Sequence, residues 1–203
     1  MREGETHGFD VAVLLALRDP GDPADPLGPG WVEEFARDVT ALGGTGVLVM
    51  VTLTAAGYLW LTGRRGATAL ALGAAASGNA VSMLLKGGFD RPRPDLVPHG
   101  AVTYTSSFPS AHAMMAAVVY LTLAVMLARV EKRRRVRVYI LTVAIVLTLL
   151  VGTSRVYLGV HWPTDVLAGW AAGAGWALGC LLVAAWLQRR GVIAPSPRDD
   201  PEE

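Results

Sequence analysis

The stretch PTDVLAGWAAGAGWALGCLLVAAWL, residues 163–187, decides the fold of this 203-residue chain. From Val166 to Leu187 it carries no charged residue. An α-helix needs about 20 predominantly apolar residues to cross the hydrocarbon core of a bilayer. Pro163 suits the first position of a helix, where the N–H that it lacks would have had no partner. We therefore expect a membrane-spanning helix over residues 163–187.

Four further apolar runs precede this one and predict four more spans. Hydrophobic residues make up 52% of the chain and charged residues only 17%. Small residues crowd the second run, so we expect that helix to pack inside the bundle. The predicted fold class is an all-α, polytopic membrane helix bundle with five transmembrane helices. The first four cover residues 45–61, 67–85, 113–130 and 138–152.

Basic residues gather in three short segments that fall on one side of a five-span bundle. Short loops rich in Lys and Arg stay on the cytoplasmic side of a membrane. The extracytoplasmic side then holds residues 1–44, which are rich in acidic residues, and the loops 86–112 and 154–162. The basic segments contain Arg64 and Arg65, then Lys132, Arg133, Arg134, Arg135 and Arg137, and finally Arg189 and Arg190.

The parts of the chain outside the spans also have a predicted organisation. Residues 11–17 and 31–42 are expected to form interfacial helices, and residues 19–30, rich in Pro, Gly and Asp, a loop. The bias towards Ala, Gly and Arg is typical of a bacterium with GC-rich DNA, which places the protein in a bacterial cytoplasmic membrane. The chain divides into an extracytoplasmic N-terminal segment, a membrane-embedded domain and a disordered cytoplasmic tail, covering residues 1–44, 45–190 and 191–203.

Polar residues recur at the extracytoplasmic ends of the predicted helices. Lys86 ends the second helix, Arg93 lies in the loop after it, and Arg155 ends the fourth. Ionisable residues at membrane depth are costly and usually functional, and a cluster of cations fits a phosphate group. Ser110 is placed to cap the third helix, whose free N–H groups from Ala111 onward point at the same anion. We expect these five residues to form a phosphate-binding site.

Two histidines add a reaction to this binding site. Asp165 follows His161 by about one helical turn, so its carboxylate can hold one ring nitrogen and leave the other as a nucleophile. His161 would then attack phosphorus and form a phosphohistidine, while His112 protonates the leaving oxygen and later activates water. No acidic cluster of the kind that holds magnesium accompanies them, so we expect no metal and no other cofactor.

These residues form three motifs that resemble those of the type 2 phosphatidic acid phosphatase family of membrane enzymes. The resemblance covers about residues 31–187. It implies a metal-independent histidine phosphatase that faces away from the cytoplasm. It also implies a substrate such as undecaprenyl diphosphate, phosphatidylglycerol phosphate or phosphatidic acid. The motif Lys-x6-Arg-Pro is Lys86, Arg93 and Pro94; Pro-Ser-Gly-His is Pro109, Ser110, Ala111 and His112; and Ser-Arg-x5-His-x3-Asp is Ser154, Arg155, His161 and Asp165.

Two features depart from the family pattern. Ala111 stands where the family has glycine, which keeps the backbone N–H but adds a methyl group to the site. Many members of the family have six spans, whereas five are predicted here. This chain is then either a shorter variant or one whose true start lies upstream.

Three other functions would use the same residues, either in part or in full. A soluble vanadate haloperoxidase shares the site residues but not the five spans. A lipid transporter or scramblase would need the cations but not the pair His161 and Asp165. A phosphotransferase would need all of them and pass the phosphoryl group to another acceptor.

Arg91 fits no motif position and is interpreted as part of the loop or of the substrate rim. The expected partners are a lipid phosphate and membrane lipids, not nucleic acid; the sequence predicts no oligomeric state.

Overall fold

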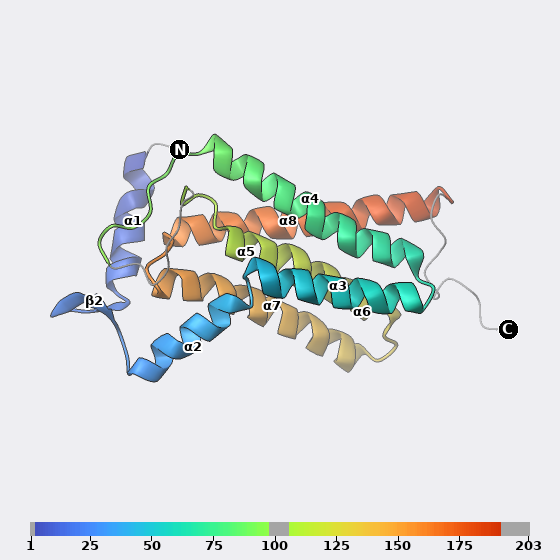
Figure 1. The fold of residues 1–203 in the computed structure, drawn as a ribbon, viewed down its shortest axis with the longest axis horizontal. Helices are drawn as coiled ribbons and strands as arrows, with labels where there is room; N and C mark the ends of the chain where they lie inside the picture. The colour runs from blue at the N-terminus through green and yellow to red at the C-terminus, as the bar shows by residue number, and fades with distance from the viewer. Residues whose placement is uncertain (1–2, 98–105, 192–203) are drawn as a thin grey trace.

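Long helices lying side by side form the body of the protein in the computed structural model, which describes residues 3–97 and 106–191 (Figure 1). Four of these helices are long and apolar enough to cross a membrane. One of the four contains a π-helical segment, η1, between two α-helical parts. The four are α4 (Arg65–Gly88), α5–η1–α6 (Ala111–Ala116, Ala117–Leu121 and Thr122–Val130), α7 (Arg134–Tyr157) and α8 (Pro163–Arg189).

The first predicted span, residues 45–61, has the predicted bounds but is bent away from the helix before it. Helix α3 (Thr45–Leu61) contains 17 residues and reaches the length of a span only together with α2 (Gly30–Ala41), across a bend of 49°. The hydroxyl group of Tyr120, in η1, donates a hydrogen bond of 2.7 Å to the carbonyl of Leu42 at this bend. The bend therefore has a partner in the bundle. Counting α2 and α3 as one span, residues 3–97 and 106–191 contain up to five spans.

The most buried span is the third. In an apolar stretch of 18 residues within α5–α6, half of the residues are buried, against 28% in the corresponding stretch of α4. The closest packing of small residues joins α8 to α5, where a Cβ atom at Gly169 would lie 2.7 Å from the carbonyl oxygen of Ser110. In contrast, a Cβ atom at Gly73, in α4, would meet nothing within 4 Å. Ala71, Ala74 and Gly78, however, are buried, and a Cβ atom at Gly78 would lie 3.0 Å from the side chain of Val118 in η1. One face of α4 is therefore packed in the bundle as expected, while Gly73 lies on an open face.

Helix α7 is longer than the apolar run that predicted it. The expected span covered residues 138–152, whereas the helix begins at Arg134 and ends at Tyr157. Polar residues end an apolar run without ending a helix, because Arg has a high helix propensity. The extension carries Arg155 as part of the last turn of α7.

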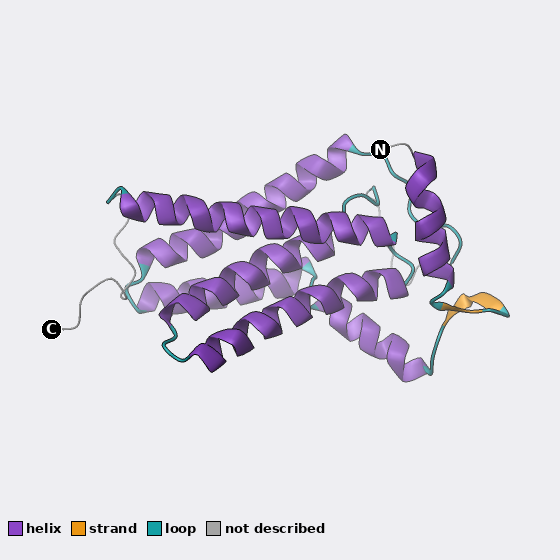
Figure 2. Cartoon of the chain, turned by 180° about the vertical axis from the view of Figure 1, so that it is seen from behind, coloured by secondary structure: helices purple, strands orange, loops and turns teal. Residues whose placement is uncertain are grey.

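The N-terminal segment packs across one end of the bundle (Figure 2). It contains α1 (Glu3–Leu15) and a short antiparallel hairpin of β1 (Arg18–Asp19) and β2 (Asp22–Pro26), where the sequence predicted only a loop. The Asp19 carboxylate accepts a hydrogen bond of 2.7 Å from the N–H of Gly21, which tightens the hairpin turn. Leu14 is fully buried against Trp162 and Val166, so α1 is docked on the bundle. The expected disordered tail lies outside the described residues after Gly191.

Two glycines of α8 allow a matched test of this packing. A Cβ atom at Gly173 would overlap the carbonyl oxygen of Met114, whereas at Gly175 it would meet nothing within 4 Å. We expect Gly173→Ala to destabilise the fold by about 1–3 kcal/mol through overpacking. We expect Gly175→Ala to leave stability unchanged or to raise it by less than about 1 kcal/mol. Thermal unfolding in detergent, followed by circular dichroism, measures both; equal shifts would contradict the close approach of α5 and α8.

Candidate active site

His161 lies in the short connection between α7 and α8, at the end of the bundle where α1 packs. Gly159 follows the end of α7 by two residues and has a φ of +69°, a conformation that favours glycine. A Cβ atom there would also lie 2.9 Å from a guanidinium nitrogen of Arg18. Two residues later the imidazole of His161 is 2% exposed, and Pro163 then begins α8. The local sequence therefore turns the chain sharply and buries the imidazole between two long helices.

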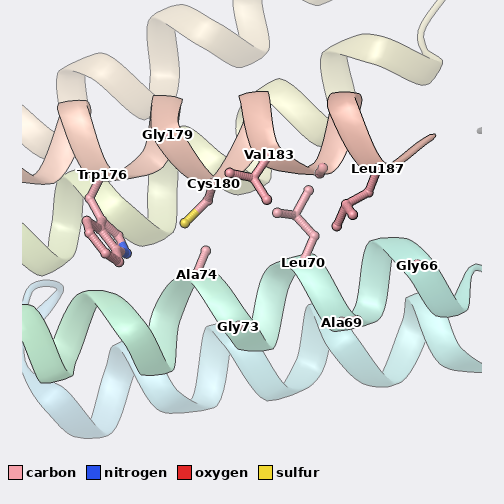
Figure 3. A pocket seen from close by; sticks show the side chains of 11 residues that line it. Gly66, Ala69, Leu70, Gly73, Ala74, Trp176, Gly179, Cys180, Val183 and Leu187 are labelled. Carbon is pink, nitrogen blue, oxygen red and sulfur yellow. The ribbon is translucent and has the colours of Figure 1, made fainter. Parts of the chain in front are cut away.

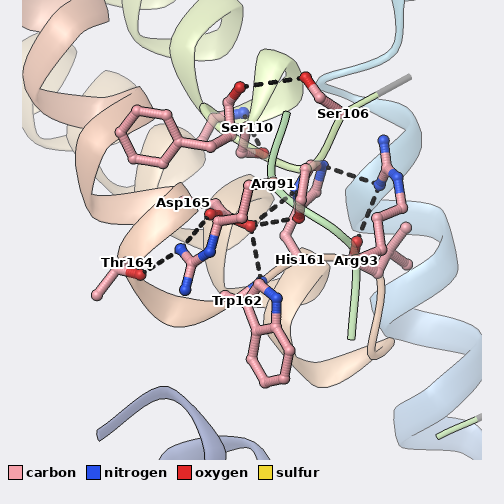
Figure 4. A network of polar contacts seen from close by, with 12 residues as sticks. Arg91, Arg93, Ser106, Ser110, His161, Trp162, Thr164 and Asp165 are labelled. Carbon is pink, nitrogen blue, oxygen red and sulfur yellow. Dashed lines mark hydrogen bonds and ion pairs between the residues drawn. The ribbon is translucent and has the colours of Figure 1, made fainter. Parts of the chain in front are cut away.

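The carboxylate of Asp165, in the first turn of α8, is fully buried and holds His161 from one side (Figure 4). Its Oδ2 lies 3.5 Å from Nδ1 of His161. The same oxygen accepts hydrogen bonds from the hydroxyl of Ser107 at 2.5 Å and from the backbone N–H of Trp162 at 3.0 Å. The predicted contact between His161 and Asp165 across one helical turn is therefore present in the structure.

Arg91, which fits no motif position, makes the shortest contact with the other oxygen of Asp165. Its Nη1 donates to Oδ1 of Asp165 at 2.6 Å, and its Nη2 donates to the carboxylate of Asp10 at 2.6 Å. Asp10 comes from α1, is fully buried, and also accepts hydrogen bonds from the backbone N–H and the hydroxyl of Thr164 at 2.9 and 2.7 Å. A chain of charges thus runs from α1 through Arg91 to Asp165.

Sequence reasoning missed this chain of contacts. Arg91 was assigned to the loop or the substrate rim because Arg93 filled the motif position. Asp10 was one of many acidic residues in the N-terminal segment and nothing in its surroundings distinguished it. The one available signal was that two arginines alternate with prolines in Arg-Pro-Arg-Pro, residues 91–94, which holds both near the same site.

Cations occupy the other side of the His161 ring. Nη1 of Arg93 lies 3.4 Å from Nε2 of His161 and donates to the carbonyl of Val160 at 2.9 Å. Lys86, at the end of α4, donates to the carbonyl of Ser106 at 2.8 Å. Lys86 thus reaches the site from the last turn of α4, and Arg93 from the loop that joins α4 to α5.

Arg155 reaches the same site from the last turn of α7. Its Nη1 donates to the hydroxyl of Thr40 at 3.3 Å, and its buried Nε has no hydrogen-bond partner among the described residues. A buried guanidinium donor without an acceptor is uncommon, because its desolvation is not compensated. The site therefore offers at least one donor that an anion could satisfy.

The N-terminus of α5 completes the arrangement. Ser110 is fully buried at the N-cap position, and its hydroxyl accepts the N–H of Ala113 at 3.5 Å. Its own N–H donates to the backbone carbonyl of Asp165 at 3.0 Å, which fixes the start of α5 against the start of α8. Ala111 and His112 follow in the first turn. His112 lies close enough to Arg155 and His161 to interact electrostatically with both side chains. The structure thus brings the predicted site residues to one end of the bundle.

Burial governs the protonation of His161. Desolvation lowers the pKa of its imidazole from 6.5 to about 4, although the contact with Asp165 acts in the opposite direction. Burial also lowers the pKa of the Arg93 guanidinium, which remains charged at neutral pH. His161 is therefore a neutral imidazole at pH 7, with Nδ1 facing a carboxylate and Nε2 facing a cation. Within residues 3–97 and 106–191, no three His, Cys, Asp or Glu side chains gather closely enough to hold a metal ion.

Comparison with known sequences finds a family model and two relatives that match this chain. The family model described as the PAP2 superfamily matches residues 67–189. Phosphatidylglycerophosphatase B of Bacillus subtilis (strain 168) is 34% identical over 149 residues, which are 70% of this chain and 70% of that protein. An undecaprenyl-diphosphatase of Sulfolobus acidocaldarius is 37% identical over 68 residues, which are 34% of this chain and 29% of that protein.

Comparison with solved structures gives the same fold. The crystal structure of a transmembrane PAP2-type phosphatidylglycerolphosphate phosphatase from Bacillus subtilis has a TM-score of 0.79 and 27% identity, covering 93% of this chain and 90% of that one. LpxE of Aquifex aeolicus, at 24% identity and a TM-score of 0.60, covers 84% and 91% and shows likeness of fold alone. The multi-pass helical bundle and the match over residues 67–189 show that this chain is a membrane protein of the PAP2 superfamily.

Proposed function

We propose that the protein is a lipid phosphatase that works through a phosphohistidine at His161. The orientation of this side chain carries the proposal. Its Nδ1 faces the Asp165 carboxylate at 3.5 Å and its Nε2 faces Arg93 at 3.4 Å. A neutral imidazole held in this way keeps its proton on Nδ1 and a lone pair on Nε2, which is the nitrogen directed at the cationic side of the site.

The reaction proceeds in two displacements. In the first, Nε2 of His161 attacks phosphorus, the bond from phosphorus to the lipid oxygen breaks, and His112 gives a proton to that oxygen. In the second, His112 takes a proton from water, the resulting hydroxide attacks the phosphohistidine, and inorganic phosphate leaves while His161 is restored. Asp165 stabilises the positive charge that the imidazole acquires while it carries the phosphoryl group.

The remaining site residues bind the phosphoryl oxygens. Lys86, Arg93 and Arg155 supply positive charge, and the hydroxyl of Ser110 and the N–H of Ala111 supply donors at the start of α5. Donors placed before the reaction lower its barrier, because no reorganisation is needed when charge shifts onto these oxygens. The methyl group of Ala111, where the family has glycine, narrows this part of the pocket. Neither a metal ion nor another cofactor takes part in the proposed reaction.

Phosphatidylglycerol phosphate, undecaprenyl diphosphate and phosphatidic acid are the proposed substrates. The relative that is 34% identical over 70% of this chain is a phosphatidylglycerophosphatase, which favours the first of these. The basic segments at the opposite end of the bundle favour a site on the extracytoplasmic face of a bacterial cytoplasmic membrane. In this orientation residues 1–44 lie outside, residues 45–190 form the embedded domain, and residues 191–203 form a cytoplasmic tail.

The nucleophile is tested with purified protein in detergent and a panel of lipid phosphates and diphosphates. We expect phosphate release to continue in EDTA and to fall at least about 1,000-fold in His161→Ala, because no other nucleophile replaces the imidazole. An unchanged unfolding temperature is the control for the fold. Release that persists in His161→Ala would show that the nucleophile is misassigned. Release that EDTA abolishes would show that a metal is required. Transfer to added lipid or sugar alcohols in place of water would identify a phosphotransferase.

The chain of contacts from Asp10 to Asp165 predicts an effect on turnover. Asp10→Asn removes the charge of one carboxylate, and Arg91→Lys removes the fork geometry through which arginine donates to both. Each variant therefore weakens the bridge between the two carboxylates. We expect kcat to fall by about 10- to 100-fold with a smaller change in KM, because His161 is less well oriented. The matched controls are Glu33→Gln and Arg37→Lys, which alter an ion pair exposed on α2. Equal effects of both pairs of variants would contradict the positioning role.

The low pKa of His161 predicts the acidic limb of the activity profile. Protonation removes the lone pair of Nε2, so activity is lost as the pH falls through the pKa of the folded protein, about 4, and not through 6.5. Below that point we expect kcat/KM to fall about ten-fold per pH unit. Phosphomonoesters titrate near pH 6, so the ionisation of the substrate is measured by phosphorus NMR and removed from the profile. Return to pH 7 before assay controls for unfolding. A corrected limb near pH 6.5 would contradict a buried, neutral imidazole.

A further inference from the structure

A groove with a volume of about 440 Å³ opens between α4 and α8, at the end of the bundle away from the candidate active site (Figure 3). Gly66 and Gly73 line it on α4, and Trp176, Gly179 and Leu187 line it on α8. The walls are almost wholly apolar. Neither Gly73 nor Gly179 would bring a Cβ atom within 4 Å of another residue, so the space in front of both is open.

The length of the groove along the helix axis is close to the thickness of one leaflet of a bilayer. At its inner end the indole N–H of Trp176 donates to the hydroxyl of Ser77 at 3.1 Å and joins the two helices. From Leu187 to Trp176 the helix rises about 16 Å, at 1.5 Å per residue. Half of the hydrocarbon core of a bilayer is about 15 Å thick. The groove therefore matches the length of an acyl chain that enters from one surface of the membrane.

Four arginines lie at the helix ends next to the outer end of the groove. Arg64 and Arg65 precede and begin α4, and Arg189 and Arg190 end and follow α8. Arg65 lies over the ring of Trp60 at 5.5 Å, and Arg190 lies over its neighbour Trp186 at 5.0 Å. In the described part of the chain, none of the four forms an ion pair with a carboxylate.

From this combination we infer a second lipid site, in which the groove holds one acyl chain of an anionic phospholipid and the arginines hold its phosphate. An apolar groove alone would accept any lipid tail. The arginines supply the selection, because basic residues beside membrane helices bind anionic headgroups. The site is separate from the candidate active site, since it uses the opposite ends of the same two helices. It does not depend on the proposed reaction.

Native mass spectrometry of the delipidated full chain tests this site. The probes are phosphatidylglycerol and phosphatidylcholine with identical acyl chains, titrated one against the other. We expect one phosphatidylglycerol per chain to be retained in preference to phosphatidylcholine. In Arg65→Gln with Arg189→Gln this preference should fall roughly 30-fold, the loss expected for two headgroup charges. In Gly73→Leu with Gly179→Leu, side chains fill the groove and we expect both lipids to be lost.

Two matched controls separate a built site from general attraction to the membrane surface. Arg134→Gln with Arg135→Gln removes two exposed arginines at the start of α7, and Gly57→Leu adds a side chain to an open position on α3. Both should retain phosphatidylglycerol as the wild type does. Equal retention of the two lipids by the wild type, or an equal loss in the control variants, would overturn the inference. Phosphatase activity and unfolding temperature confirm that each variant is folded.

Discussion

The fully buried carboxylate of Asp165 is the constraint on which the geometry of the site depends. A carboxylate removed from water costs several kcal/mol unless charged or polar donors surround it. Arg91, Ser107 and the backbone N–H of Trp162 supply those donors, while His161 lies beside them. Arg91 and Ser107 come from the loop that joins α4 to α5, and Asp165 itself belongs to α8. Satisfying one charge therefore fixes the loop, the turn before α8 and the imidazole relative to one another.

Arg91 extends this constraint to the N-terminal segment. Its second guanidinium nitrogen is bound by Asp10, so α1 supplies the counter-charge that keeps the guanidinium in place. The family match begins at residue 67, so Asp10 lies outside it. Asp10 is nevertheless as fully buried as Asp165. The N-terminal helix is therefore part of the support for the site.

What the sequence predicts well is local or periodic. Apolar runs identified the long helices, and one helical turn placed Asp165 beside His161, because both depend on residues close in the chain. What it missed depends on contacts between distant segments. The π-helical segment at Tyr120, the bend at Leu42 and the bridge from Asp10 through Arg91 each join residues that no spacing rule connects. The two faces of α4 differ for a related reason. Its small residues pack closely at Gly78, which faces Val118, and leave a groove at Gly73, where no other residue lies within 4 Å of a Cβ position.

The charges around His161 are arranged unequally on the two sides of its ring. On the Nδ1 side the carboxylates of Asp10 and Asp165 share the guanidinium of Arg91, which leaves one net negative charge close to the imidazole.

On the Nε2 side lies Arg93, and Lys86 and Arg155 are near enough to it to interact electrostatically. Lys86 and Arg155 donate to neutral oxygens, the carbonyl of Ser106 and the hydroxyl of Thr40. The imidazole is neutral at pH 7, so it carries no charge that could compensate the positive charge of Lys86 or Arg155. A phosphate dianion arriving at Nε2 would neutralise the cations in a place where water screens them poorly. The positive charge that then develops on the ring would face Asp165. The same asymmetry thus favours binding of the anion and formation of a bond to the nitrogen that faces it.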